Sequence, residues 1–164
     1  MFTIYSADVT GNPGNCSYPH KHVILDEASL KDGICHDYVC AEYRNNYRNG
    51  DNFIGSDCLP VDCDNDHTED PAGWKTPEDV MGAFPGVTFA IHYSRFNMRE
   101  KNGKPARPKF HVLFPIDYVT DAALYSDMRS WSIPSSRTST PRRLTPPASS
   151  SEPARRMSLC IRAA

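Results

Sequence analysis

The chain has 164 residues, 18 basic and 20 acidic side chains and a formal net charge of −2, a length that suits one domain with its own core. It lacks an apolar run long enough to span a bilayer, and its first ten residues lack the basic start and apolar block of a secretory signal. These features argue against a membrane partner and predict a cytoplasmic protein. The six cysteines are then expected to be reduced thiols, because the sequence shows no secretory signal. The four-residue spacings at 35–40 and 58–63 do not match those of paired zinc ligands.

The first third of the chain is predicted to form short elements separated by turn-forming residues. In chain order we expect a strand at 2–5, a turn-rich loop at 10–19, an extended segment at 21–24, a helix opening at 26–30, a helix at 37–47 and a loop at 49–52. The helix at 37–47 rests on apolar residues that stand only partly at helical spacing, namely Tyr38, Cys40, Ala41 and Tyr43.

The rest of the body is predicted to alternate strands with helices. We expect a strand at 61–64, a helix at 76–84, a strand at 87–93, a basic loop at 95–108, a strand at 110–114 and a helix at 120–128. Thr76 followed by Pro77 is a strong helix start, and Thr120 or Asp121 caps the last helix. Strands interleaved with helices indicate an α/β or α+β domain.

Charge is distributed unevenly along the chain. Residues 51–79 contain nine acids and one lysine, whereas residues 95–109 contain six basic residues and one glutamate. Such a pair of segments suits a metal-and-phosphate site, and it equally suits two solvated surfaces. Residues 129–164 hold seven arginines, one glutamate, nine serines and five prolines. Their composition predicts a disordered tail after a domain that spans residues 1–128.

The centre of the chain carries an Asp-x-Asp motif. On a strand, Asp62 and Asp64 project to one face while Val61 and Cys63 face the core. Two neighbouring carboxylates resist joint ionisation unless a cation lies between them, and their hard oxygen atoms suit Mg²⁺ or Mn²⁺. The alternative is ordinary turn chemistry, since aspartate and asparagine bond their own backbone.

An EF-hand calcium loop fits this segment less well than a simple acidic pair. Asp62, Asp64 and Asp66 match its first ligand positions, but His67 stands where the loop needs glycine. Gly73 stands where the loop needs its final glutamate.

Three motifs taken together resemble the catalytic domain of archaeo-eukaryotic-type primases, closest to the primase-polymerase domains of bacterial phages and mobile elements. The first is Asp62-x-Asp64-Asn65-Asp66-His67, the second is Tyr93-Ser94-Arg95, and the third runs from Arg107 to Pro115 through His111. The resemblance covers residues 1–128. It implies an α+β fold in which helices flank a small antiparallel sheet, with a core like the RNA-recognition motif and incomplete at its C-terminal end.

The resemblance also implies a reaction, the transfer of nucleotides from nucleoside triphosphates to a primer on a single-stranded DNA template. Asp62 and Asp64 would hold Mg²⁺ or Mn²⁺, and with His111 they would form the catalytic set. The incoming nucleotide would contact Ser94, Arg95, Lys109 and His111. The template backbone would contact Lys101, Lys104 and Arg107. A replicative helicase domain or protein is a further implied partner.

Each assignment has a structural alternative. His111 also reads as a partly buried strand residue, with Phe110, Val112 and Phe114 on the opposite, buried face. Ser94 also reads as a turn residue. Trp74 and Tyr93 read as core residues or as platforms for a base.

The chain departs from the family after residue 128. The family continues there with a further strand that supplies another metal-binding acid, and this chain has the Ser/Pro/Arg-rich tail in its place. Permitted codons for residues 137–152 can be chosen so that a shifted frame encodes Tyr-Phe-Asp-Ala-Gln-Ala-Leu-Asp-Ala-Ala-Arg-Phe-Phe-Phe-Gly, which has the family's pattern. We therefore hypothesise a frameshift near Arg129. It predicts impaired catalysis, marginal stability and aggregation, and Asp117 and Asp121 are badly placed as substitutes.

Two other functions remain open from the sequence. A non-catalytic fragment that binds nucleic acid or a replication partner fits the missing third acid and the basic tail. A metal-dependent nuclease or hydrolase fits the Asp-x-Asp motif, which serves those enzymes as well.

Overall fold

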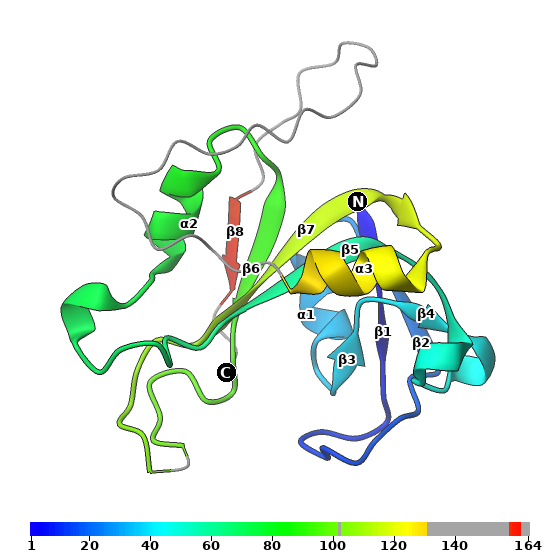
Figure 1. Cartoon of the computed structure of the whole chain (residues 1–164), viewed down its shortest axis with the longest axis horizontal. Coiled ribbons are helices and arrows are strands. Elements are labelled where there is room, and N and C mark those ends of the chain that lie inside the picture. Colours follow the sequence, from blue (N-terminus) through cyan, green and yellow to red (C-terminus); the bar gives the residue numbers. More distant parts are fainter. Residues whose placement is uncertain (102, 131–157, 162–164) are drawn as a thin grey trace.

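The computed structural model describes residues 1–101, 103–130 and, for the backbone only, 158–161. The chain has an α+β fold with two sheets and few helices (Figure 1). Within the described residues, no helix is both long enough and apolar enough to cross a membrane.

The smaller sheet contains three antiparallel strands in the order β2-β1-β3. They are β1 (Phe2–Ser6), β2 (His20–Ile24) and β3 (Tyr38–Val39). The helix α1 (Glu27–Gly33) follows β2, and a capping box between Asp26 and Ser29 starts it. The predicted strands at 2–5 and 21–24 and the helix start at 26 are thereby confirmed.

The larger sheet has the order β4-β5-β7-β6-β8. Its strands are β4 (Glu42–Tyr43), β5 (Phe53–Cys63), β6 (Phe89–Tyr93), β7 (Phe110–Val119) and β8 (Ser158–Ile161). All pairs are antiparallel except β6 with β8, which is parallel. The long central strand β5 starts well before the predicted segment at 61–64 and ends at Cys63, and β7 continues well past the predicted segment at 110–114.

Two helices cover one face of the larger sheet. α2 (Pro77–Ala83) starts with the predicted Thr76 cap and Pro77, and α3 (Ala122–Arg129) starts with Asp121 as its cap. Short 3₁₀ turns at Arg44–Asn46, Gly50–Asn52 and Pro71–Gly73 complete the described elements.

The predicted helix at 37–47 is wrong. This segment forms β3, β4 and a 3₁₀ turn instead. Cys40 and Ala41 are adjacent yet are buried in different apolar clusters, as in an extended chain whose side chains alternate. Asn45 and Asn46 then take positive φ angles of 58° and 56°, which interrupts a regular helix.

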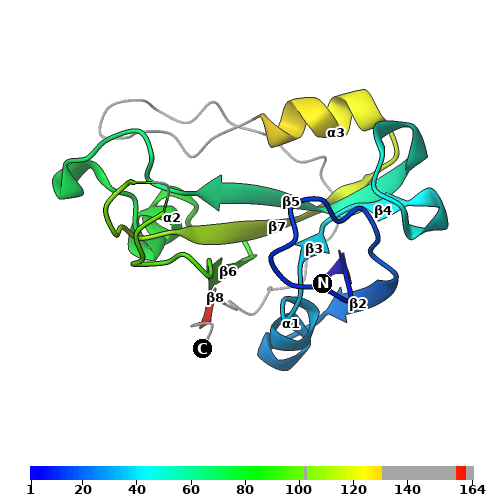
Figure 2. The same ribbon diagram turned by 90° about the horizontal axis from the view of Figure 1, so that it is seen from below.

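Other elements lie on both sides of the larger sheet (Figure 2). Viewed along this direction, α3 lies on one side of β5 and β7, and the smaller sheet with α1 lies on the other. The helical side holds one apolar cluster, made by Ala41, Leu59, Val61, Cys63, Val80, Phe89, Ile91, Phe110, Val112, Phe114 and Tyr125. The other side holds a second cluster, made by Phe2, Ile4, Ile24, Leu30, Cys40, Cys58, Ala90 and Leu113.

Most of the predicted tail lies outside the described residues. The exceptions are Arg129 and Ser130 at the end of α3, and β8, which pairs with β6 from Phe89 to His92 although composition predicted no regular structure there. The five cysteines whose side chains are described are free thiols, namely Cys16, Cys35, Cys40, Cys58 and Cys63.

Candidate functional site

A row of titratable side chains crosses the larger sheet near the C-terminal end of β5. The strand register places Asp62 of β5 opposite His111 of β7, and His111 opposite His92 of β6. The two imidazole rings stack, with centroids 4.9 Å apart and an interplanar angle of 25°. We call Asp62, His111, His92 and Tyr38, which completes the set from β3, the histidine row.

The exposed end of the histidine row is the pair between Asp62 and His111. His111 Nδ1 lies 2.5 Å from Asp62 Oδ1, and the side chains are 29% and 65% exposed. The hydrogen bond from His111 lowers the pKa of Asp62, against a smaller opposing effect of burial. Because Nδ1 donates to the carboxylate, Nε2 is the nitrogen of His111 that remains for a ligand.

The buried end of the row is His92, which is 6% exposed. Burial lowers its pKa to about 4, and the neighbouring His111 acts in the same direction. His92 is therefore neutral near pH 7. Its Nδ1 lies 3.3 Å from the carbonyl oxygen of Tyr93 and donates to it, so Nε2 accepts from the Tyr38 hydroxyl at 2.7 Å.

A second row lies next to the histidine row, just beyond the end of β5, where Asp64 follows Asp62 by two residues and Lys109 precedes His111 by two. Lys109 is only 4% exposed, yet its Nζ lies 3.3 Å from Oδ1 of Asp64 and 3.3 Å from Oδ1 of Asp66. Lys104 Nζ also pairs with Asp66 at 3.1 Å. Hydrogen bonds from these two lysines lower the pKa of Asp66. We call Asp64, Asp66, Lys109 and Arg107 the lysine row.

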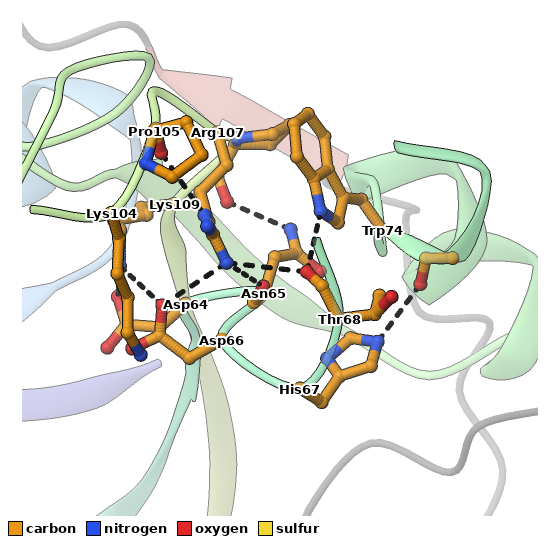
Figure 3. A network of polar contacts seen from close by, with 12 residues as sticks. Asp64, Asn65, Asp66, His67, Thr68, Trp74, Lys104, Pro105, Arg107 and Lys109 are labelled. Carbon is orange, nitrogen blue, oxygen red and sulfur yellow. Dashed lines mark hydrogen bonds and ion pairs between the residues drawn. The ribbon is translucent and has the colours of Figure 1, made fainter. Parts of the chain in front are cut away.

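Arg107 anchors this row from below the surface (Figure 3). Its side chain is 1% exposed, and it donates to the carbonyl oxygens of Asn65 at 2.9 Å, Thr68 at 3.3 Å and Pro105 at 3.2 Å. Its guanidinium carbon lies 5.8 Å from the centre of the Trp74 ring. Nη2 has no hydrogen-bond partner within the described part of the chain. The cation–π contact with Trp74 offsets part of the cost of burying this charged group.

Asn65 closes the same connection with a left-handed backbone conformation, φ 54°. Its side-chain amide donates to the carbonyl oxygens of Lys75 and Pro108, and its side-chain oxygen accepts from the Lys75 N–H at 2.7 Å. The loop after β5 is thereby held against the start of β7. The Asn65 side chain therefore bonds the backbone of distant segments and not its own, unlike the local turn bonds that the alternative interpretation of this motif predicted.

The structure separates the predicted site residues into two groups. The predicted alternation in β5 is confirmed, because Val61 and Cys63 are buried while Asp62 and Asp64 are exposed. Asp62, Asp64, Lys109 and His111 share one face of the sheet end, as the two rows describe. Phe110, Val112 and Phe114 occupy the opposite, buried face, so His111 also has the surroundings of a partly buried strand residue.

Arg107 does not fit its predicted template contact. Its guanidinium is buried and is committed to backbone carbonyls, so a DNA backbone at the surface has no access to it. This part of the prediction is corrected, and Arg107 belongs to the scaffold. Lys101 and Lys104 remain exposed, and Lys104 is paired with Asp66.

Ser94 and Arg95 stand at the start of the loop after β6. Ser94 Oγ accepts from the Phe96 N–H at 3.3 Å, as a turn residue does. Arg95 Nη2 donates to Asp37 at 2.7 Å, with the two side chains 50% and 16% exposed. Burial raises the pKa of Asp37, but bonds from Gly11, Asn12 and Arg95 outweigh it, and the net shift is downward.

The donor atoms of the acidic pair fit a hard divalent cation only in part. Asp62 and Asp64 each use Oδ1 in the contacts above, and within the described residues no hydrogen bond or ion pair engages either Oδ2. The described residues contain no cluster of three or more histidine, cysteine or acidic side chains that would hold a metal alone. The pair therefore suits a cation whose other ligands are water and substrate oxygens, the usual arrangement for Mg²⁺.

The sequence did not predict the roles of four residues of this site. Tyr38 and His92 belong to the histidine row, Asn65 holds the loop after β5, and Asp66 pairs with Lys109. A signal existed for His92, because the 87–93 and 110–114 strands each carry one histidine among apolar residues. No sequence signal pointed to Tyr38, which reaches the row from the smaller sheet.

An open depression of about 560 Å³ lies away from both rows, and no predicted site residue borders it. Its lining residues are Tyr43, Arg48, Asn49, Gly50, Phe53, Ala122, Tyr125, Ser126, Arg129 and Ser130.

Comparison with known proteins gives no relative: no family model, no curated protein and no solved structure matches this chain.

Proposed function

We propose that this chain is a primase-polymerase-like nucleotidyltransferase domain from a phage or mobile element, whose catalysis is impaired as the chain stands. One observation carries the proposal: Asp62, on β5, and Asp64, just beyond its end, lie beside His111 and Lys109, and no described residue engages the Oδ2 atom of either carboxylate. The antiparallel β5-β7-β6 core with helices on one face supports a relation to the RNA-recognition-motif-like primase core.

The proposed cofactor is Mg²⁺ or Mn²⁺, held by Asp62 and Asp64 together with substrate oxygens. Such a cation, when bound, polarises the phosphate and favours the ionised primer 3′-hydroxyl. The exposure of the two side chains, 65% and 52%, supports access for a nucleotide from solvent.

The basic residues of the site have distinct proposed roles. His111 presents Nε2 to the phosphates, because Nδ1 is held by Asp62. Lys109 provides a fixed positive charge behind the carboxylates, because its stem is buried. Arg95 reaches the phosphates by leaving Asp37, and Ser94 orients the turn that carries it.

Catalysis is proposed to be impaired because the metal site has two carboxylates and lacks the third that the family supplies. Asp117 lies on β7 in the part nearest α3, several residues from His111, and Asp121 is occupied as the N-cap of α3. With only the Asp62–Asp64 pair, we expect a weak metal site and slow transfer. Joining the shifted reading frame to residues 1–128 would supply the missing acid.

The test combines binding with activity. Equilibrium titration of the full chain with Mn²⁺ and a fluorescent nucleoside triphosphate should show metal-dependent nucleotide binding that falls at least about tenfold in Asp62→Ala and Asp64→Ala. Asp117→Ala is the matched control, an exposed acid on the same sheet. A repaired version, in which residues 1–128 continue into the shifted reading frame, should also extend a primer, and both substitutions should abolish that extension. Extension that survives both would refute the proposal.

Two rival outcomes are separable in the same experiments. Cleavage of DNA without added nucleotide would identify a metal-dependent nuclease. Metal-independent binding of DNA without incorporation by the repaired version would identify a non-catalytic binding fragment.

A further inference from the structure

The loop between β6 and β7 holds six basic residues, of which some are buried, some form ion pairs and some are exposed without a carboxylate partner. We call residues 95–109 the basic loop. Arg107 and Lys109 are buried and hold its base, as described above. Arg95 and Lys104 form ion pairs with Asp37 and Asp66. The residues that remain are Arg99 and Lys101.

Arg99 and Lys101 are both exposed, and neither has a carboxylate partner within the described part of the chain. Beside them lies Phe96, an aromatic side chain that is 40% exposed. Lys101 Nζ is 4.4 Å from the centre of the Phe96 ring. Met98 is 57% exposed and takes a positive φ of 53°, which an L-residue rarely adopts.

The base of the basic loop is fixed to the end of the sheet. Ser94 N–H donates to the Lys109 carbonyl at 2.9 Å, and Met98 N–H donates to the Arg107 carbonyl at 2.9 Å. The Asn97 side chain accepts from Lys109 N–H at 3.0 Å. Phe96 is therefore presented by an anchored turn, next to the strand end that carries the lysine row.

We propose that Phe96, Arg99 and Lys101 form a contact surface for single-stranded nucleic acid, with a base stacked on Phe96 and phosphates at the two cations. The proposal rests on the function proposed above and names the residues that receive its template. An exposed ring provides a stacking platform for any base, and unpaired cations beside it neutralise the backbone. The turn that carries Phe96 is bonded to Lys109, and Lys109 contacts Asp64. A nucleic-acid strand bound at this surface would therefore lie near the acidic pair.

Nucleic acid fits this surface better than a membrane does. A membrane-binding element presents a broad apolar face, whereas this surface has Phe96 and Met98 among charged residues. Glu100, an exposed acid between Arg99 and Lys101 in the sequence, adds a negative charge that disfavours an anionic lipid surface.

The test is fluorescence anisotropy of the full chain with a labelled oligothymidylate across a salt series. We expect Phe96→Ala to weaken binding about 5- to 150-fold, the range of a lost base stack, while Phe96→Trp retains it. The double variant Arg99→Ala/Lys101→Ala should reduce the slope of log affinity against log salt by about 1.4, from about 0.7 per cation on a single strand.

Two controls match these variants. Tyr118→Ala removes an aromatic side chain that is 54% exposed, and Lys21→Ala removes a lysine that also lies near a tyrosine ring, at 5.9 Å. Both should bind the oligonucleotide like the unaltered chain. Unchanged affinity in Phe96→Ala together with an unchanged slope in the double variant would overturn the proposal, as would tighter binding to anionic vesicles than to the oligonucleotide.

Failure of this surface is distinguishable from failure of the proposed function. If only the surface is misassigned, Mn²⁺-dependent nucleotide binding still depends on Asp62 and Asp64. If the nucleotidyltransferase assignment is wrong, that dependence is lost whatever the oligonucleotide does.

Discussion

Asp62 and Asp64 stand two residues apart on the same face, yet they have different electrostatic surroundings. Asp62 bonds to His111, whose ring stacks on the buried, neutral His92. Asp64 shares the ammonium of Lys109 with Asp66. The histidine row therefore contains a buried imidazole with a strongly lowered pKa, whereas in the lysine row a buried ammonium lies between two carboxylates.

The difference arises from what lies behind each row. The smaller sheet lies behind the buried end of the histidine row and supplies Tyr38, whose hydroxyl donates to His92 Nε2. A loop covers the lysine row, and Arg107 holds that loop through its backbone carbonyls. The histidine row should therefore respond to pH, whereas the lysine row should respond to the loss of single side chains.

The largest effect is expected at Arg107. Arg107→Ala should lower the free energy of unfolding by about 3 kcal/mol or more, because the carbonyl groups of Asn65, Thr68 and Pro105 lose their donor and the loop loses a fully buried side chain. Urea denaturation monitored by circular dichroism measures this change. Arg99→Ala on the same loop is the control and should stay within about 0.5 kcal/mol. Equal stability of the two variants would show that Arg107 does not anchor the lysine row.

The histidine row should make stability depend on pH. His92 has a folded-state pKa of about 4 against an ordinary 6.5, so the unfolded chain binds the proton first. Its contribution is complete above pH 6.5 and is lost as pH falls toward 4, by about 2 kcal/mol at pH 5. Urea denaturation at about pH 7.5 and about pH 5 measures this loss.

His92→Phe is the control for that pH dependence, because it keeps a flat ring in place and removes the titration. Its stability should vary less between the two pH values than that of the unaltered chain. Asp62 does not contribute in this window, because its lowered pKa places its own loss below its ordinary 3.8. Identical pH slopes in both proteins would exclude His92 as the cause.

An intermediate loss of stability is expected when Lys109, in the lysine row, is replaced. Lys109→Met keeps the buried stem and removes the charge between Asp64 and Asp66, so we expect a loss of about 1 to 2 kcal/mol, discounted because both carboxylates are half exposed. Mn²⁺ should bind this variant more tightly, since a competing cation is gone. Lys104→Met, at an exposed ion pair, is the control. Weaker Mn²⁺ binding in Lys109→Met would contradict this account.

The smallest stability effect is expected at Arg95. Arg95→Ala breaks a half-exposed ion pair with Asp37 and should cost under about 1 kcal/mol. Nucleotide affinity should nevertheless fall several-fold if Arg95 contacts the phosphates. A change in stability without a change in nucleotide affinity would assign Arg95 to the scaffold alone.

Sequence reasoning predicted local features and failed on non-local ones. The cap at Thr76, the restriction of the last cap to Thr120 or Asp121, and the alternation around Asp62 follow from the sequence, because they depend on near neighbours. The 37–47 segment was misassigned, because its apolar residues serve two clusters on opposite sides of the chain. The register that joins Asp62 to His111 and His92 could not be derived, because it depends on strand pairing over long separations.

The sequence by itself determined the alternating acidic strand, the helix starts and the concentration of positive charge at residues 95–109. The tertiary structure alone decided which of those charges are used internally and which remain exposed. The physical reason is burial: a guanidinium or ammonium group that leaves water must find partners inside the fold, and only the packed loops determine whether Arg107 and Lys109 or Arg99 and Lys101 do so.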